Sequence, residues 1–108
     1  MKYINKNLLI EKVNVQDIAI KFGTPIYCYS YKQLKENISN FKKSFKTFSP
    51  LICFAIKSNT NVKLIREIRK LGLGADVVSI GELMMALKAG IDPKKIVFSG
   101  VGKTSNEI

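Results

Sequence analysis

Short apolar runs separated by stretches of helical spacing make up the second half of the chain. Residues 51–56 form a continuous apolar run between Pro50 and a polar segment, 58–60, which is typical of a strand buried on both faces. Further along, apolar residues recur every three or four positions, as on one face of a helix. The predicted order is strand 51–56, helix 61–71, strand 75–78, helix 79–90 and strand 95–98.

The first half of the chain predicts two capped helices around a short strand. The expected elements are a strand or extended arm at 1–13, a helix at 14–22, a strand at 24–29 and a helix from 30 to about 48. Asn14 and Ser30 are favourable N-caps, and Gly23 suits the end of the first helix. In the second helix the apolar residues, Phe41 and Phe45 among them, predict a face packed against a core.

Strands and helices that alternate at about twenty residues per repeat predict a parallel sheet. Crossovers between such strands are right-handed, so the carboxyl ends of neighbouring strands lie at one edge. We therefore expect Lys57, Asp76 and Ser99 to meet at that edge. A closed eight-stranded barrel needs roughly 250 residues, so we expect this chain to be a piece of a longer protein.

The chain is strongly basic, with 18 Lys and Arg against 8 Asp and Glu and a formal net charge of +10. Such a charge is common in nucleic-acid-binding proteins. The lysines, however, are scattered among apolar positions, and neither a helix-turn-helix nor an aromatic ribonucleoprotein motif accompanies them. We therefore do not expect nucleic acid as a partner.

The cysteines and the absence of histidine limit the kinds of site. Cys28 and Cys53 lie in apolar runs outside any Cys-x-x-Cys motif, so we expect buried, reduced thiols. Without histidine, neither a metal site nor thiol-imidazole catalysis has its usual ligands or base, and we expect no metal. No apolar run is long enough to span a membrane and no basic leader is present, so we expect a cytoplasmic protein without membrane partners.

Lys57 ends the apolar run 51–56 and has two interpretations. A lysine just past a strand usually extends into water. A lysine held in an apolar pocket instead has its charged form disfavoured, so its neutral amine can form a Schiff base with an aldehyde or ketone. The apolar run alone leaves both interpretations open.

The residues around Lys57 favour the second interpretation. Phe54-Ala55-Ile56-Lys57-Ser58-Asn59 resembles the aromatic-Ala-x-Lys-Ala-Asn signature of the alanine-racemase-like (fold-type III) enzymes, which use pyridoxal 5'-phosphate (PLP). The resemblance implies that Lys57 is catalytic and holds PLP as a Schiff base. Ser58 stands where alanine is usual, which exchanges one small residue for another.

Three further segments, in the family's order, resemble the diaminopimelate decarboxylases. They are a helix with Gly-Thr-Pro and an aromatic strand at 17–29, a Gly-x-Gly-x-Asp-Val-x-Ser-x-Gly-Glu-Leu block at 72–83, and Phe-Ser-Gly-x-Gly-Lys at 98–103. Gly72 and Gly74 precede a strand and lack the third glycine of a dinucleotide loop, and the glycines before Lys103 do not fit a Walker A loop. The chain thus resembles the ornithine, diaminopimelate and arginine decarboxylase family.

The resemblance implies an α/β fold, the N-terminal portion of a PLP-binding (β/α)8 TIM-like barrel. About three parallel βα units would lie in 31–108, and the arm, short helix and strand of 1–30 would belong with a C-terminal β-domain. Asp76 would lie near the cofactor and Lys57, where a carboxylate can hold an ammonium group. Glu82, three residues after Ser79, completes a predicted capping box at a helix start.

The activity implied is PLP-dependent decarboxylation of the amino acid meso-diaminopimelate to L-lysine, by a homodimer with its active site at the interface. Ornithine, arginine and carboxynorspermidine decarboxylation stay open. So does an inactive relic or split-gene product that only holds PLP or docks a partner. The family's ring-stacking histidine and substrate-binding β-domain lie outside these residues, so we expect the 108 residues alone to be inactive and to aggregate.

Overall fold

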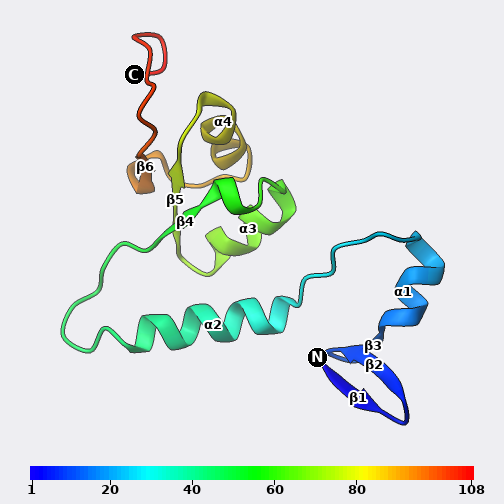
Figure 1. Cartoon of the computed structure of the whole chain (residues 1–108). Helices are drawn as coiled ribbons and strands as arrows, with labels where there is room; N and C mark the ends of the chain where they lie inside the picture. Colours follow the sequence, from blue (N-terminus) through cyan, green and yellow to red (C-terminus); the bar gives the residue numbers. More distant parts are fainter. The chain divides into compact units, whose positions relative to one another are not determined.

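The computed structural model describes residues 1–108, which divide into two units, Met1–Ser44 and Phe45–Ile108. The first unit contains a three-stranded antiparallel sheet followed by two helices (Figure 1). Its elements are β1 (Lys2–Ile4), β2 (Asn7–Ile10), β3 (Val13–Asn14), α1 (Val15–Phe22) and α2 (Tyr31–Lys43).

The segment predicted as a strand or extended arm is a small β-meander. The turn between β1 and β2 has positive φ at Asn5 (48°) and Lys6 (66°), as tight hairpin turns require. β3 pairs with β2 and leads directly into α1. The predicted cap of α1 is confirmed, since the Asn14 side chain accepts a hydrogen bond from Gln16 N at 3.0 Å and Gly23, with φ of 80°, ends the helix.

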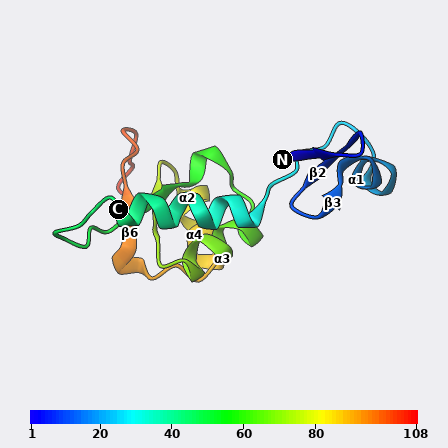
Figure 2. The ribbon, with the colours of Figure 1, turned by 90° about the horizontal axis from the view of Figure 1, so that it is seen from below.

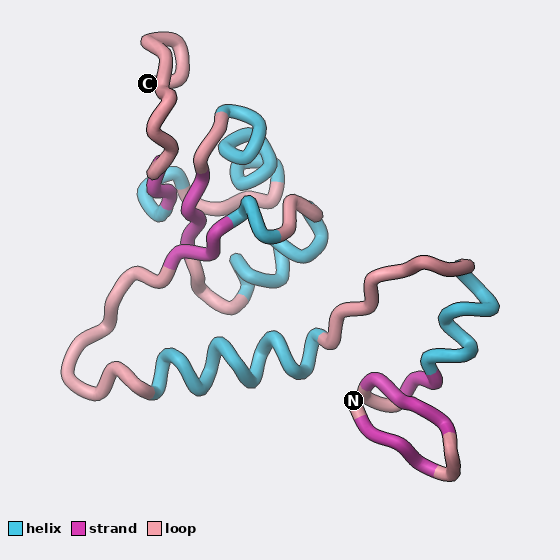
Figure 3. Tube along the Cα trace, viewed as in Figure 1, coloured by secondary structure: helices cyan, strands magenta, loops and turns pink.

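The strand predicted at 24–29 is wrong, because these residues form the loop between α1 and α2 (Figure 3). A strand needs a neighbour that exchanges backbone hydrogen bonds with it, and the sheet of this unit consists of β1, β2 and β3 alone. The aromatic side chains of the loop stay in solvent, with Tyr27 89% and Tyr29 66% exposed. The apolar residues of this segment therefore lie in an exposed loop and not in a paired strand in this structure.

α2 is shorter than its aromatic spacing predicted. The helix ends at Lys43 and not near residue 48. Beyond its end, Phe45 and Phe48 pack edge to face, with 5.4 Å between their ring centroids. No residue of α2 is buried and Phe41 is 53% exposed, so the packed face predicted for this helix is not buried in the structure.

Glu11, between β2 and β3, anchors the start of α2. Glu11 Oε1 accepts hydrogen bonds from Ser30 Oγ at 2.7 Å and from Lys32 N at 2.9 Å. Ser30 is the N-cap of α2 as predicted, and its Oγ accepts from Gln33 N at 3.0 Å. The bond from the Lys32 backbone and then that from Ser30 hold the pKa of Glu11 below its ordinary value.

The second unit is an α/β unit with a parallel sheet, as predicted. Its elements are β4 (Cys53–Ala55), the 3₁₀ turn η1 (Ile56–Ser58), α3 (Val62–Lys70), β5 (Gly74–Val77), α4 (Ile80–Lys88), the 3₁₀ turn η2 (Pro93–Lys95) and β6 (Ile96–Phe98). The strands lie side by side in the order β4-β5-β6. Both helices begin at polar caps, where the Asn61 and Ser79 side chains accept from Lys63 N at 2.9 Å and Glu82 N at 3.2 Å.

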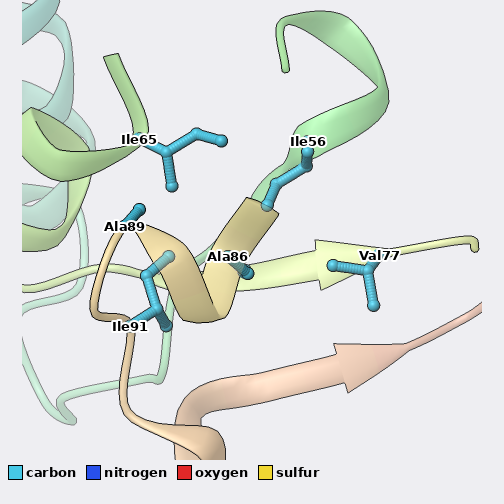
Figure 4. Close-up of a cluster of buried hydrophobic side chains, with 7 residues drawn as sticks. Ile56, Ile65, Val77, Ala86, Ala89 and Ile91 are labelled. Carbon is cyan, nitrogen blue, oxygen red and sulfur yellow. The ribbon is translucent and has the colours of Figure 1, made fainter. Parts of the chain in front are cut away.

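One face of the sheet is covered by the helices. Ala75 and Val77 of β5 are fully buried and lie in one apolar cluster with Ile56, Ile65 and Ala86 (Figure 4). α3 and α4 contact each other and lie next to each other in both views of the ribbon (Figures 1 and 2). The core of this unit therefore lies between β5 and the helix pair.

The opposite face of the sheet, called the open face below, is less buried within this unit. Because side chains alternate along a strand, Gly74 and Asp76 lie on the face opposite Ala75 and Val77. Their partners in register are Cys53 and Ala55 of β4 and Val97 of β6. Every residue of β4 is only half-buried and Val97 is 47% exposed, so the prediction that 51–56 is a strand buried on both faces is wrong.

Gly74 and Gly100 let neighbouring backbones approach at opposite ends of β5. A Cβ on Gly74 would overlap the carbonyl oxygen of Lys95 before β6, and a Cβ on Gly100 would overlap the carbonyl oxygen of Val78 after β5. Both glycines are buried. The close pairing of β5 with the segment around β6 therefore depends on two positions without a side chain. None of the helices has the length and apolar character needed to cross a membrane.

We expect loss of the Glu11 contact in acid. Since the folded-state pKa of Glu11 lies below 4.5, the contact stabilises the start of α2 above that pH and is lost as the pH falls through the folded-state pKa. The Lys32 amide proton, followed by NMR, should titrate with a midpoint below 4.5. Glu11→Gln should abolish this titration, and Glu36→Gln on the same helix should not. Persistence of the titration in Glu11→Gln would contradict the contact.

We expect Gly100→Ala to destabilise the protein, because the new methyl group meets backbone that cannot move aside without opening the sheet. The loss should be roughly 1–3 kcal/mol, the usual effect of overpacking, and urea denaturation measures it. Gly102→Ala is the matched control, since no atom lies within 4 Å of its added Cβ. Equal stabilities of the two variants would show that the backbones are less close than the structure has them.

Candidate active-site edge of the parallel sheet

The carboxyl ends of the three strands bring polar side chains to one edge of the sheet. Asp76 in β5 pairs in register with Ala55 of β4 and with Val97 of β6. Lys57 and Ser99 each lie two residues beyond this row. The topology therefore gathers the ends of all three strands at one edge, as the sequence predicted, and this is where parallel α/β barrels place catalytic groups.

Asp76 and Ser99 are in direct contact. Ser99 Oγ donates a hydrogen bond to Asp76 Oδ1 at 2.5 Å. The distance lies within the usual range for a hydroxyl bound to a carboxylate, a bond stronger than one between neutral groups. The Ser99 backbone is also fixed, because its N–H donates to Val77 O at 2.9 Å and continues the pairing of β5 with β6 by one residue. Of the three residues expected to meet, these two do.

Lys57 lies at the same edge but does not touch Asp76. The chain leaves β4 after Ala55 and enters the η1 turn, where Ile56 takes the fully buried position and Lys57 is exposed. No salt bridge or side-chain hydrogen bond involves Lys57. Residues 45–108 therefore form neither the apolar pocket nor the contact with Asp76 that the sequence predicted for Lys57.

The backbone around Lys57 is held firmly. Ser58 Oγ donates to Ala55 O at 2.8 Å, and Asn59 N donates to Ile56 O at 2.9 Å. The serine that replaces the family's usual alanine thus satisfies the last carbonyl of β4. Asn59 Oδ1 in turn accepts from Asn61 N at 3.0 Å, which ties the turn to the start of α3. Lys57 therefore extends from a fixed point although its amine has no partner.

The prediction that both thiols are buried is wrong, because Cys28 is exposed and Cys53, on the open face, is only half-buried. Cys53 is free, and its thiol donates to Lys95 O at 3.8 Å. Burial first, and the charge of Asp76 second, raise the pKa of the Cys53 thiol. The thiol therefore stays protonated at neutral pH, and it is one of the side chains on the open face of the sheet.

Glu82 is a helix cap, as predicted. Its backbone N–H is bonded to Ser79 Oγ, and its own Oε2 accepts from Val78 N at 2.9 Å. In the usual capping box this carboxylate reaches the N–H of the capping residue itself, so here it acts one residue earlier. Glu82 thereby joins the end of β5 to the start of α4, next to Asp76 in the chain.

The loop after β6 is closed by Lys103. Its Nζ donates to Gly100 O at 2.6 Å and lies 5.2 Å from the centroid of the Phe98 ring, within the range of a cation–π contact. No pattern in the sequence predicts this role for Lys103. The contact folds Lys103 back onto its own loop, on the chain segment that also carries Ser99.

Comparison with known families decides the assignment. The sequence profile of the pyridoxal-dependent decarboxylase, pyridoxal-binding domain, matches residues 31–108. The chain belongs to this family. Its fold is accordingly the first part of a PLP-binding barrel domain, in agreement with the parallel βα units of the structure.

Several relatives of this pyridoxal-binding-domain chain are named diaminopimelate decarboxylase. The one from Aquifex aeolicus is 45% identical over 108 residues, which are 100% of this chain and 25% of the relative. The crystal structure of the M. jannaschii enzyme matches 98% of this chain and 26% of its own length with a TM-score of 0.93 and 37% identity. That of the Helicobacter pylori enzyme complexed with L-lysine matches 87% of this chain and 24% of its own length, with a TM-score of 0.80 and 45% identity.

A more distant solved structure shares the fold alone. The ornithine decarboxylase from Entamoeba histolytica has a TM-score of 0.70 and 24% identity over 85% of this chain and 29% of its own. The chain spans about a quarter of the length of the curated relatives it matches. The family assignment therefore covers this segment, and the activity of a whole enzyme is a separate matter.

Proposed function

We propose that this chain carries the cofactor-holding segment of an enzyme that removes the α-carboxylate of meso-diaminopimelate to give L-lysine, with PLP as cofactor. The observation that carries the proposal is the 45% identity, over all 108 residues, to a protein named diaminopimelate decarboxylase. Seven further relatives of that name are 43–47% identical to the chain. The relatives are about four times longer, so the proposal concerns the enzyme of which such a segment is one part.

The residues at the sheet edge fit a pyridoxal group. Lys57 offers a primary amine without a partner just beyond the carboxyl end of β4, and Asp76 offers a carboxylate on the neighbouring strand β5. When bound, PLP supplies an electron-withdrawing ring that accepts the electron pair left by the departing carbon dioxide. Lys57 Nζ would be the atom that holds the cofactor, and it would have to lose a proton to do so.

Asp76 would assist Lys57 by electrostatics. Its Oδ1 is occupied by Ser99, whereas Oδ2 accepts no hydrogen bond. A carboxylate close to an amine favours the ammonium form, so Asp76 would hold the Lys57 ammonium when the substrate amine takes its place on the cofactor. This role needs Lys57 to turn toward Asp76, which is compatible with the exposed position of the lysine side chain.

Other members of the family are the alternative to diaminopimelate as substrate. Ornithine, arginine and carboxynorspermidine are the other candidate substrates, and the ornithine decarboxylase compared above shares the fold. A homodimer, with a small amino acid as its ligand, belongs to the same proposal.

Both cysteines are free, which supports placing the enzyme in the reducing cytoplasm.

We expect borohydride reduction of the PLP-loaded protein to fix a pyridoxyl group on Lys57. Peptide mapping by mass spectrometry locates the modified residue. Lys57→Ala should abolish the labelling, because it removes the only amine proposed to hold the cofactor. Lys63→Ala, an exposed lysine on α3, is the control and should leave the labelling unchanged. A pyridoxyl group found mainly on another lysine would overturn the assignment of Lys57.

Substrate choice is tested with the full-length enzyme. We expect release of carbon dioxide and L-lysine from meso-diaminopimelate, with kcat/KM for ornithine and arginine at least about a hundredfold lower, because a site built for a polar far end rejects analogues that leave its groups unpaired. Chromatography of the amino-acid products measures this. Faster turnover of ornithine would move the enzyme to another branch of the family, whereas cofactor labelling without turnover of any substrate would support a chain that only holds PLP.

A further inference from the structure

The hydrogen bond between Ser99 and Asp76 is the one side-chain hydrogen bond that joins neighbouring strands at the carboxyl edge of the sheet. The row of Asp76 contains Ala55 and Val97, neither of which has a hydrogen-bonding side chain. Cys53, on the same face, donates instead to Lys95 O. Ser99 is therefore the sole side-chain partner that the described residues give to the Asp76 carboxylate.

Ser99 has little freedom to be elsewhere. Its backbone N–H is bonded to Val77 O at 2.9 Å, on the strand that carries Asp76. The next residue, Gly100, is buried against the carbonyl of Val78, where no side chain fits. Beyond it, Lys103 Nζ closes the loop on Gly100 O at 2.6 Å. The position of the Ser99 hydroxyl is thus determined by backbone contacts on both sides.

A fixed hydroxyl constrains the carboxylate that accepts its hydrogen bond. Rotation of the Asp76 carboxylate about its last bond is broad in the absence of a partner. With Oδ1 held by Ser99, the carboxylate keeps one orientation, and Oδ2 is the oxygen left for another partner. A group held in a productive orientation before substrate arrives contributes to catalysis without reorganising during the reaction.

We propose that Ser99 is a positioning residue, which orients Asp76 through this hydrogen bond toward the group held by Lys57. The inference rests on the proposed function, because it assigns Asp76 a partner at Lys57. Ser99 itself touches neither the cofactor nor the substrate in this scheme. Its effect is transmitted through Asp76 alone, and this makes the proposal testable by combining variants.

The test uses the PLP-loaded full-length enzyme and four variants. Ser99→Ala removes the hydroxyl, Ser99→Thr keeps it on an exposed residue with room for a methyl group, and Asp76→Asn removes the charge. We expect Ser99→Ala to lower kcat roughly tenfold with KM within about twofold, the loss of about one charge-assisted hydrogen bond. Ser99→Thr should recover activity to within about twofold of the parent. Ser105→Ala, an exposed serine in the same C-terminal segment, is the control and should change nothing.

A spectroscopic measurement accompanies the kinetics. The visible absorption band of the cofactor should shift in Ser99→Ala and Asp76→Asn, and should not shift in Ser99→Thr or Ser105→Ala. In the Asp76→Asn background, a further Ser99→Ala change should have no additional effect on kcat or on the band, since the two residues act as one unit. Equal, independent losses from the two changes, or an unaltered band in Ser99→Ala, would overturn the positioning role.

A cofactor-free measurement separates this inference from the proposed function. The coupling between Ser99→Ala and Asp76→Asn in urea unfolding of the apoprotein reports the hydrogen bond itself. Coupling in the apoprotein together with a normal band and kcat in Ser99→Ala would leave the decarboxylase proposal standing and overturn the positioning role. If the parent enzyme binds no PLP, or Lys57→Ala binds it unchanged, both proposals are overturned.

Discussion

The alternation of side chains along β5 is the constraint on which the candidate site depends. Ala75 and Val77 are buried under α3 and α4, and this burial fixes which way the strand faces. A shift of one residue in register would bring Asp76 into the apolar cluster, where an unpaired carboxylate is far too costly. The hydrophobic contact between β5 and the helices therefore determines that Asp76 lies on the open face, beside the strand that leads to Lys57.

Backbone contacts then convert this orientation into a defined position. Gly74 and Gly100 allow close approach of neighbouring chain segments at the two ends of β5, so β6 and the loop that follows it have little room to shift. The hydroxyl of Ser99 reaches Asp76 because the chain after β6 lies so close to the end of β5. The packing of Ala75 and Val77 and the close backbone contacts at Gly74 and Gly100 thus together determine the position of the Asp76 carboxylate, although neither involves that carboxylate directly.

Features determined by local residues could be predicted from the sequence, and features determined by distant partners could not. The predicted caps at Asn14, Ser30 and Ser79 are confirmed, because a capping side chain bonds to the backbone two or three residues away. The strand at 24–29 was wrong, and so was the burial of 51–56 on both faces, because pairing and covering need segments far away in sequence. Within the site, the topology predicted that Asp76 and Ser99 meet, whereas the role of Lys57 came from a motif, and its exposure is one of the two interpretations that the apolar run alone left open.

Catalysis by Lys57 would need both a defined position and a suitable environment for its amine. The first is position, and residues 51–99 supply it by placing a lysine, a carboxylate and a hydroxyl at one edge of a parallel sheet. The second is an environment of low polarity, which disfavours the ammonium form and makes the amine reactive at neutral pH. Within residues 45–108 the Lys57 side chain is exposed. The residues described here therefore determine where the reaction would occur more than how fast it would proceed.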